Sequence, residues 1–332
     1  MRENAVAYIQ RQKGISSPFF LYVPFQEAHS PDQVDQKYKD LYPALQSTPQ
    51  NQALAGMITH TDEMVGDIVA ALNASGLYEN TIIVFSSDNG GPGGQDMLIP
   101  RPQRFDPNYL DRNWPFRGQK HELYEGGVHV AGFVHSPLLP ASVRGTTLQE
   151  LFHVTDWLPT LLSITGTKAT RKHQPFDGHD MWGCIQGDTS LCSRKDVVLN
   201  INTVCDDPGA GSTDFKTECP APKAAMRVGD LKVLAECFDS ASLSFKGRMS
   251  LYNITADRSE AHDLASQQPA ALKELSARLL SYAKEASMVP PLEDSAPWQG
   301  PGYYCSECTP GRPQGWRRSW EVWWKGPAGQ VC

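Results

Sequence analysis

The sequence has no long apolar run, no cysteine in its first half and fewer positive than negative charges. No stretch approaches the roughly 18 consecutive apolar residues of a membrane-spanning helix, so we expect no membrane span. Cysteine is absent from the first 183 residues. The 30 Lys and Arg residues are outnumbered by 37 Asp and Glu residues, which leaves a formal net charge of −7. Negative charge repels a phosphate backbone and an anionic membrane surface, so nucleic acid is not an expected partner.

The rest of the composition is typical of a globular protein. Charged residues make up 20% of the chain and apolar residues 40%, which excludes disorder as the overall description. The 332 residues are about twice the length of a usual domain, so we expect one large domain and a smaller one. No internal repeat is visible.

The eight cysteines are confined to a C-terminal part rich in Gly and Pro. An even number in such a loop-rich region indicates a disulfide framework, and hence an oxidising compartment. Zinc is the alternative, because Cys305-Ser-Glu-Cys308 has the spacing of a ligand pair, but no second pair follows it. The cysteines are Cys184, Cys192, Cys205, Cys219, Cys237, Cys305, Cys308 and Cys332.

Two N-glycosylation sequons, at Asn73 and Asn253, also favour a secretory origin, either lysosomal or extracellular. The first 14 residues, however, lack the apolar segment of a signal peptide. We therefore expect this polypeptide to be the C-terminal portion of a longer precursor.

Residues 1–183 show the pattern of an α/β domain. The apolar runs 18–25 and 81–88 are typical of buried strands, and three- and four-residue spacing of apolar side chains predicts a helix between them, over 50–75. Strand, helix and strand form a βαβ unit, whose strands are parallel. A further strand is predicted at 128–135 and a helix at 148–165. The predicted fold is thus a mixed, largely parallel sheet flanked by helices.

A smaller α+β domain is predicted at 223–290, after a cysteine-containing linker at 184–222. Strands at 224–228 and 231–236 flank Gly229-Asp230, a two-residue hairpin turn, and 249–254 can add a third antiparallel strand. A helix follows over 269–286. The Pro- and Trp-rich tail, 291–332, shows no period and is predicted to be irregular.

Polar side chains follow the two predicted parallel strands at their carboxyl ends, where loops converge on ligands in such sheets. Asp88 and Asn89 offer a carboxylate and an amide oxygen, the ligand types that Ca²⁺ prefers, and two glycines after them let the backbone turn. From spacing alone, an Asx-type turn without metal is the plainer alternative.

Two further residues are candidates for chemistry at the same edge. His29 follows the first strand and could donate a proton near neutral pH, although a rim histidine is more often only hydrogen-bonded. Lys120 could hold an oxyanion as a point charge, or be one more solvated lysine. It lies in the excursion 92–127, which is longer than a plain connection and is a candidate substrate-facing loop. We expect no catalytic role for His121, His153, His173, His179 or His262.

Several stretches in order along residues 15–290 resemble the type I sulfatase family, most closely its arylsulfatase B-like branch. They are PFFLYVPFQEAHSPDQV, GLYENTIIVFSSDNGG, NWPFRGQKHELYEGGVHVAGFVHSP, FHVTDWLPTLLSITG and LYNITADRSEAHDLA. The resemblance implies that Asp88 and Asn89 bind Ca²⁺, that His29 contacts the sulfate or protonates the leaving oxygen, and that Lys120 holds a sulfate oxygen. The substrate would be a sulfate ester, of an aryl alcohol or a sugar.

The nucleophile of that family is a formylglycine made from the cysteine of a Cys-x-Pro-Ser-Arg motif. No cysteine here is followed by that pattern, and the early paired aspartates of the calcium site are absent too. We therefore expect this chain alone to bind Ca²⁺ weakly and to turn over no sulfate ester, its own N-terminal fragment being a possible partner. A bridge from Cys237 to Cys205 or Cys219 is the favoured pairing, and one cysteine of the tail is open to a partner in the N-terminal portion.

Two other functions remain open. A catalytically inactive sulfatase-like protein would keep the fold as a binding or structural module. A phosphoesterase of the same superfold would need additional zinc ligands, for which Asp177-Gly-His179-Asp180 is the nearest candidate.

Overall fold

The computed structural model describes residues 1–29, 31–91, 112–167, 176–201, 224–239, 242 and 244–288. The chain divides into two compact units, Met1–Ser287 and Met288–Cys332. Every helix and strand given below belongs to the first unit, apart from the last residue of its final helix. The predictions for the tail, for the zinc pair Cys305 and Cys308, and for Cys205 and Cys219 lie outside the described residues.

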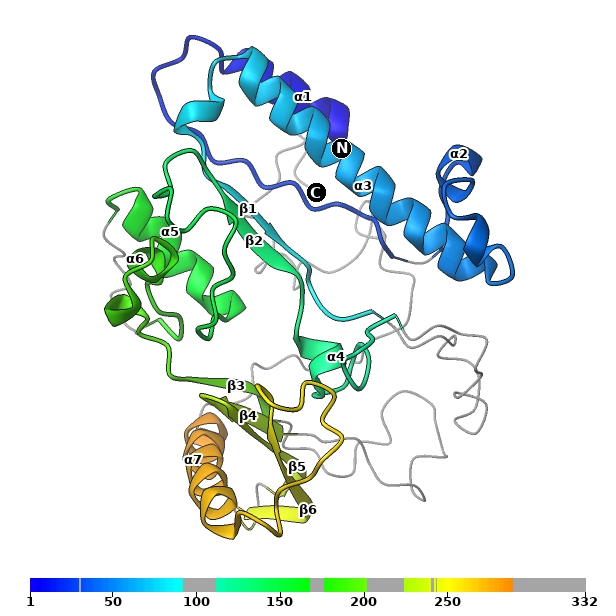
Figure 1. Cartoon of the computed structure of the whole chain (residues 1–332). Helices are drawn as coiled ribbons and strands as arrows, with labels where there is room; N and C mark the ends of the chain where they lie inside the picture. Colours follow the sequence, from blue (N-terminus) through cyan, green and yellow to red (C-terminus); the bar gives the residue numbers. More distant parts are fainter. Residues whose placement is uncertain are drawn as a thin grey trace, which may run out of the picture. The chain divides into compact units, whose positions relative to one another are not determined.

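The N-terminal part is built on a long helix, α3 (Pro49–Ala74), which confirms the helix predicted at 50–75. Proline at its first position needs no hydrogen-bonded N–H, and Gly76, at φ +70°, follows its end. A short helix at the start of the chain, α1 (Arg2–Arg11), packs on α3 (Figure 1). Between them, buried Ile9 and Leu72 form a small core. Short turns η1 (Pro43–Leu45) and η2 (Tyr78–Asn80) and helix α2 (Gln36–Lys39) complete this part.

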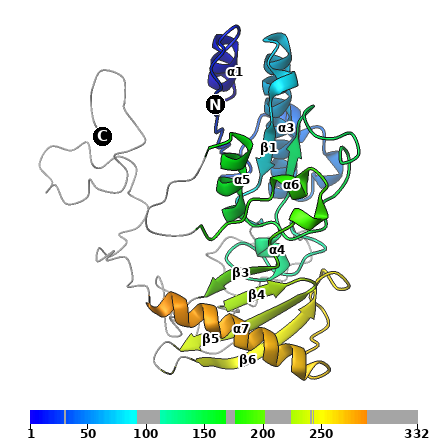
Figure 2. The same cartoon turned by 90° about the vertical axis from the view of Figure 1, so that its left-hand side faces the viewer.

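Two short strands, β1 (Ile83–Ser86) and β2 (Gly132–His135), form an antiparallel sheet in which Phe85 faces Phe133. In Figures 1 and 2 this pair lies between α3 and α5 (Trp157–Ile164). The parallel pairing predicted for 18–25 and 81–88 is not what the described residues show. Segment 18–25 is extended, but no described strand forms a ladder with it, and an extended segment becomes a strand only through such hydrogen bonds.

The helix predicted at 148–165 is shorter than expected. It consists of the turn η4 (Val154–Asp156) and α5, because the side chain of Asp156 turns back to accept the backbone N–H of His153 at 2.8 Å and so fixes the start there. Next come α6 (Trp182–Ile185) and the turn η5 (Thr189–Leu191), which a disulfide between Cys184 and Cys192 joins. This pairing was not among those predicted. The side chain of Cys237 is not described.

The C-terminal part is a four-stranded antiparallel sheet in the order β3 (Asp196–Ile201), β4 (Ala224–Val228), β5 (Leu231–Asp239) and β6 (Ser244–Asn253). Helix α7 (Pro269–Met288) packs on it through Leu275 and Leu279. The predicted hairpin is confirmed, with Val228 opposite Leu231 around Gly229. The predicted third strand and helix are also confirmed, whereas β3 adds an edge strand from within the predicted linker.

The α/β class, with a smaller antiparallel sheet and helix at the C-terminal end, is therefore confirmed. Helix α4 (Glu125–Val128) lies between the β1–β2 pair and the four-stranded sheet in both views (Figures 1 and 2). Among the described residues, no helix combines the length and apolar character needed to cross a membrane.

Candidate active site

Asp88 and Asn89 lie just after β1, which ends at Ser86, two residues before the predicted end of the strand at 88. Asp88 Oδ1 accepts the backbone N–H of Asn89 at 2.8 Å, which is the Asx-type contact of the metal-free alternative. Asn89 Nδ2 donates to the carbonyl of Gly90 at 3.0 Å. This second bond uses the amide nitrogen, so it does not consume the amide oxygen, which is the atom that a hard cation would need.

The loop that carries Lys120 is bonded to the loop that carries Asn89. The backbone N–H of Lys120 donates to the carbonyl oxygen of Gly91 at 3.0 Å. Asn113 strengthens the joint: its Oδ1 accepts the N–H of Gly91 at 2.8 Å, and its Nδ2 lies 2.9 Å from Gly91 O and 3.1 Å from Gly118 O. Two predicted site segments, joined through Gly91 and Lys120, which are 29 residues apart in sequence, are thus neighbours in space.

The segment that carries His29 is tied to the same region through Arg112. Its guanidinium donates to Asp32 Oδ2 at 3.1 Å and to Asn51 Oδ1 at 3.1 Å, and its own backbone precedes Asn113. The side chains of Arg112 and Asp32 are 12% and 16% exposed, so this ion pair is largely shielded from water. The imidazole of His29 belongs to an exposed residue. Arg112 therefore links the third predicted segment to the other two.

Close backbone packing holds these loops against α4. A methyl group at Gly90 would lie 1.8 Å from the carbonyl oxygen of Gly126, and one at Gly126 would lie 2.2 Å from that of Gly118. Only glycine fits such approaches. The sequence motif Gly90-Gly91 thus serves contact with α4 as well as the turn itself.

The donors for a calcium ion fit in type but not in number. Asp88 and Asn89 supply two protein oxygens, whereas Ca²⁺ takes about 6 to 8. Within the part of the chain that the structure describes, no three His, Cys, Asp or Glu side chains gather as a metal-binding group. These residues alone do not make a calcium site.

Most of the other residues singled out from the sequence form hydrogen bonds that stabilise the local structure. Asn73 is exposed on α3, and Asn253, at the end of β6, accepts the N–H of Ala256 at 3.0 Å. His153 and His179 each donate a backbone N–H to Asp156. The carbonyl of Asp177 accepts from Arg194 at 3.0 Å. The phosphoesterase candidate thus takes part in structural bonds around Asp156 and lies in no metal-binding group of the described residues.

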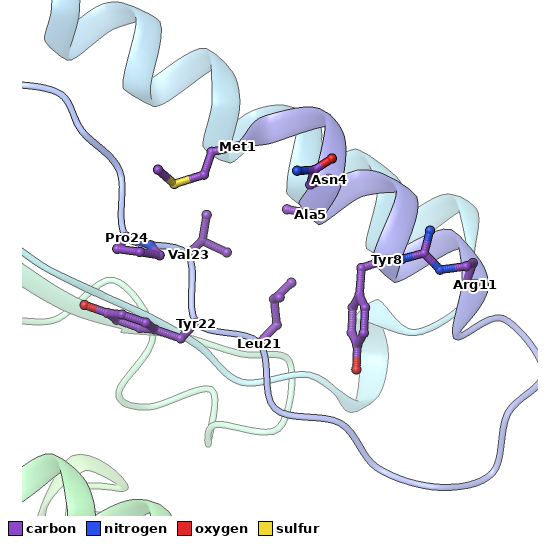
Figure 3. Close-up of a pocket in the computed structure, with 9 residues that line it drawn as sticks. All are labelled: Met1, Asn4, Ala5, Tyr8, Arg11, Leu21, Tyr22, Val23 and Pro24. Carbon is purple, nitrogen blue, oxygen red and sulfur yellow. The ribbon is translucent and has the colours of Figure 1, made fainter. Parts of the chain in front are cut away.

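A cavity of about 310 Å³ lies between α1 and the extended segment 18–25 (Figure 3). Leu21 and Val23 point toward α1 in this view, and Tyr22 points away from it. The lining contains none of the predicted site residues, so the cavity is not the candidate active site.

Sequence reasoning missed the residues that assemble the site. Asn113 and Glu125 lie in a stretch that resembles the family, and Arg112 lies just before it, but nothing in the sequence singles them out. Their partners are 22 to 107 residues away. The buried Glu125 is the clearest example. Burial acts to raise its pKa, but hydrogen bonds and charge from His129 and Lys232 outweigh this effect and lower the pKa to about 2.

Comparison with known proteins shows which family this chain belongs to. A model of the Sulfatase family matches residues 1–167, half of the chain and all three predicted site segments. The chain belongs to the sulfatase family. It is 33% identical to arylsulfatase J of Mus musculus over 294 residues. This alignment covers 82% of the present chain and 46% of arylsulfatase J. The chain is 26% identical to an N-acetylgalactosamine-6-O-sulfatase of Bacteroides thetaiotaomicron, over 80% of the chain and 47% of that protein.

Solved structures share the fold, including some that are named as sulfatases. The structure of Ps i-CgsB in complex with k-i-k-neocarrahexaose superposes with a TM-score of 0.63 at 24% identity, covering 85% of this chain and 53% of that one. The sulfatase chain described here spans about half the length of the curated relatives it matches.

Proposed function

We propose that this chain forms part of a sulfuric ester hydrolase of the arylsulfatase type. Lys120 would hold a sulfate oxygen, and His29 would contact the sulfate or protonate the leaving oxygen. The observation that supports this proposal most directly is the backbone hydrogen bond from Lys120 to Gly91. It joins the loop that carries Lys120 to the loop that carries Asp88 and Asn89. Asp88 and Asn89 would supply two of the oxygen ligands of Ca²⁺.

The roles follow from the charge that develops during the reaction. Displacement at sulfur builds negative charge on the sulfate oxygens and on the departing alcohol oxygen. An ammonium group is suited to the first, and a protonated imidazole to the second. A bound divalent cation would add charge stabilisation at the sulfate.

The substrate proposed is a sulfate ester of an aryl alcohol or of a sugar. Relatives named arylsulfatase and N-acetylgalactosamine-6-O-sulfatase support this class. The disulfide between Cys184 and Cys192 supports a secretory location, lysosomal or extracellular, since such bonds persist in oxidising compartments.

We propose further that turnover needs an N-terminal sulfatase portion that supplies the nucleophile. Segment 18–25 supports this requirement. Its exposure alternates along the chain, and Phe20 and Tyr22, on the outer side, are 73% and 76% exposed. An apolar extended segment without a ladder to any described strand is suited to pairing with an additional strand.

The test measures turnover of an aryl sulfate with Ca²⁺ by this chain, with and without an N-terminal sulfatase portion that carries Cys-x-Pro-Ser-Arg. We expect turnover only from the combination, lost in Lys120→Ala and His29→Ala but retained in Lys39→Ala, a change of a lysine outside the site. Activity of the chain alone would contradict the requirement for the N-terminal portion. Absence of activity from a folded combination would favour the inactive binding module.

A further inference from the structure

A buried charged cluster connects the C-terminal sheet to α4. Lys232, on β5, is 0% exposed, and its Nζ lies 2.8 Å from Glu125 Oε1 and 3.0 Å from Glu260 Oε1. The other oxygen of Glu260 accepts the backbone N–H of Glu125 at 2.7 Å. We call Glu125, Lys232 and Glu260 the Lys232 cluster. Buried charges are costly unless they are paired, so removing Lys232 takes away the cation that both buried carboxylates share.

Glu125 is the first residue of α4, and the next two residues form hydrogen bonds with the two site loops. Gly126 N–H donates to Arg117 O at 2.7 Å, and Gly90 N–H donates to Gly127 O at 3.0 Å. The first bond holds the segment that leads to Lys120, and the second holds the turn after Asn89. Both proposed site loops therefore rest on the two residues that follow Glu125.

Arg117 closes the connection from the other side. Its guanidinium donates to the backbone carbonyl of Glu260 at 3.2 Å and lies 4.1 Å from the centre of the Tyr124 ring. Arg117 thus attaches the segment before Lys120 to α4 through its backbone carbonyl and to Glu260 through its guanidinium.

The second carboxylate oxygen of Glu125 also has positively charged or polar neighbours. His129 Nδ1 lies 2.9 Å from Glu125 Oε2, and Arg227 NH1 lies 3.9 Å from the same oxygen. Glu125 therefore meets positive or polar partners at both of its oxygens, which fixes its rotamer and, with it, the first turn of α4.

We propose that the Lys232 cluster is a positioning device that sets the orientation of α4 and thereby places the loops of Lys120 and Asn89. Lys232, Glu125 and Glu260 are positioning residues and do not touch the substrate. The significance of this placement for catalysis rests on the proposed function. The mechanical link itself does not, because it concerns the geometry of the loops whether or not the site turns over an ester.

Amide hydrogen exchange of the full chain tests the link. The reporters are the amides of Gly90, Lys120 and Gly126, each of which donates one of the bonds described above. In Lys232→Met, we expect these three amides to exchange at least tenfold faster. The amide of Ser87, which donates to Ala131 O one residue beyond the β1–β2 pair, should stay unchanged.

The matched control is Arg194→Met, which breaks an equally buried ion pair. Arg194 NH2 lies 2.6 Å from Asp156 Oδ1, with side chains 6% and 0% exposed, and neither residue contacts α4 in any hydrogen bond or ion pair of the described residues. We expect no selective acceleration at the three reporters in this variant. Equal acceleration in both variants, or none in Lys232→Met, would overturn the proposal.

If Lys232→Met does not fold, Glu260→Gln provides the same test. It keeps the volume and an oxygen that can accept the N–H of Glu125 but removes one charge, so a smaller acceleration at the same three amides is expected, and none would again overturn the link. Turnover of the combination with the N-terminal portion is the second readout: Lys232→Met should lower kcat, and Lys232→Arg should restore part of it. Failure of turnover in every variant would refute the proposed function and leave the exchange result standing.

Discussion

The backbone amide of Lys120 lies 3.0 Å from the carbonyl oxygen of Gly91, to which it donates a hydrogen bond. This bond joins two loops that the sequence marks separately, one by its Asp-Asn-Gly-Gly motif and the other by its basic residues. The position of the lysine backbone is therefore tied to the turn that follows Asn89, and variants in either loop are expected to affect the other.

Asn113→Ala should loosen this joint. The variant removes side-chain bonds of 2.8, 2.9 and 3.1 Å to Gly91 and Gly118, and at a net value of about 1 kcal/mol per bond we expect a loss of roughly 2–3 kcal/mol of unfolding free energy. Urea denaturation checks this value. Gln36→Ala, which removes one exposed bond to Asp40, serves as the control and should cost less than about 0.5 kcal/mol. Equal losses in the two variants would contradict the clamp role of Asn113.

Gly90→Ala and Gly66→Ala should have opposite effects. A methyl group at Gly90 meets the carbonyl of Gly126 at 1.8 Å, so the loops must move apart and stability should fall by about 2 kcal/mol or more. A methyl group at Gly66, inside α3, meets nothing within 4 Å, and alanine there should stabilise the helix by about 0.5–1 kcal/mol. Thermal melting measures both changes, and a stabilised Gly90→Ala would contradict the proposed role of this close approach.

Stability should fall in acid partly because of Asp156. Burial acts to raise its pKa, but hydrogen bonds from Arg194 and from the backbone of His179 and His153 outweigh burial and lower the pKa. A carboxylate with a depressed folded-state pKa stabilises the protein above its ordinary pKa of about 4, and this contribution is lost as pH falls through the lower, folded value.

Asp156→Asn should therefore be less stable than the parent near neutral pH, by about 3 kcal/mol or more since Arg194 is left buried and unpaired. The difference should shrink as pH falls below about 4. Urea denaturation across this range measures it. A difference that stays constant from pH 7 to pH 2 would show that the ionisation of Asp156 does not contribute.

The disulfide between Cys184 and Cys192 should stabilise the α6–η5 region by closing a loop. The two cysteines are 8 residues apart, and loop-closure entropy for this length is worth about 2.5 kcal/mol. Replacing both with alanine should lower the unfolding free energy by about that amount. The same loss should appear when the parent protein is denatured in the presence of a reductant, and an unchanged denaturation midpoint in the double variant would refute the contribution.

The elements that the sequence predicted well are those whose signal is local. Helix α3 and helix α7 follow from apolar spacing, and the β4–β5 hairpin follows from Gly229-Asp230. The strand at 18–25 was predicted from composition alone, yet pairing depends on a neighbour that composition does not specify. The late start of α5 depends on the side chain of Asp156, whose contact with His153 the apolar pattern does not reveal.

The candidate site divides in the same way. Residue type and position made Asp88, Asn89, His29 and Lys120 candidates for holding an oxyanion and a hard cation, and the resemblance to the sulfatase family favoured these roles over the plainer alternatives. Only the tertiary structure decided which backbones hold them: the amide of Asn113, the guanidinium of Arg112 and the ion pairs of Lys232 join segments distant in sequence. Such contacts depend on three-dimensional distance and burial, which no local pattern of residues encodes.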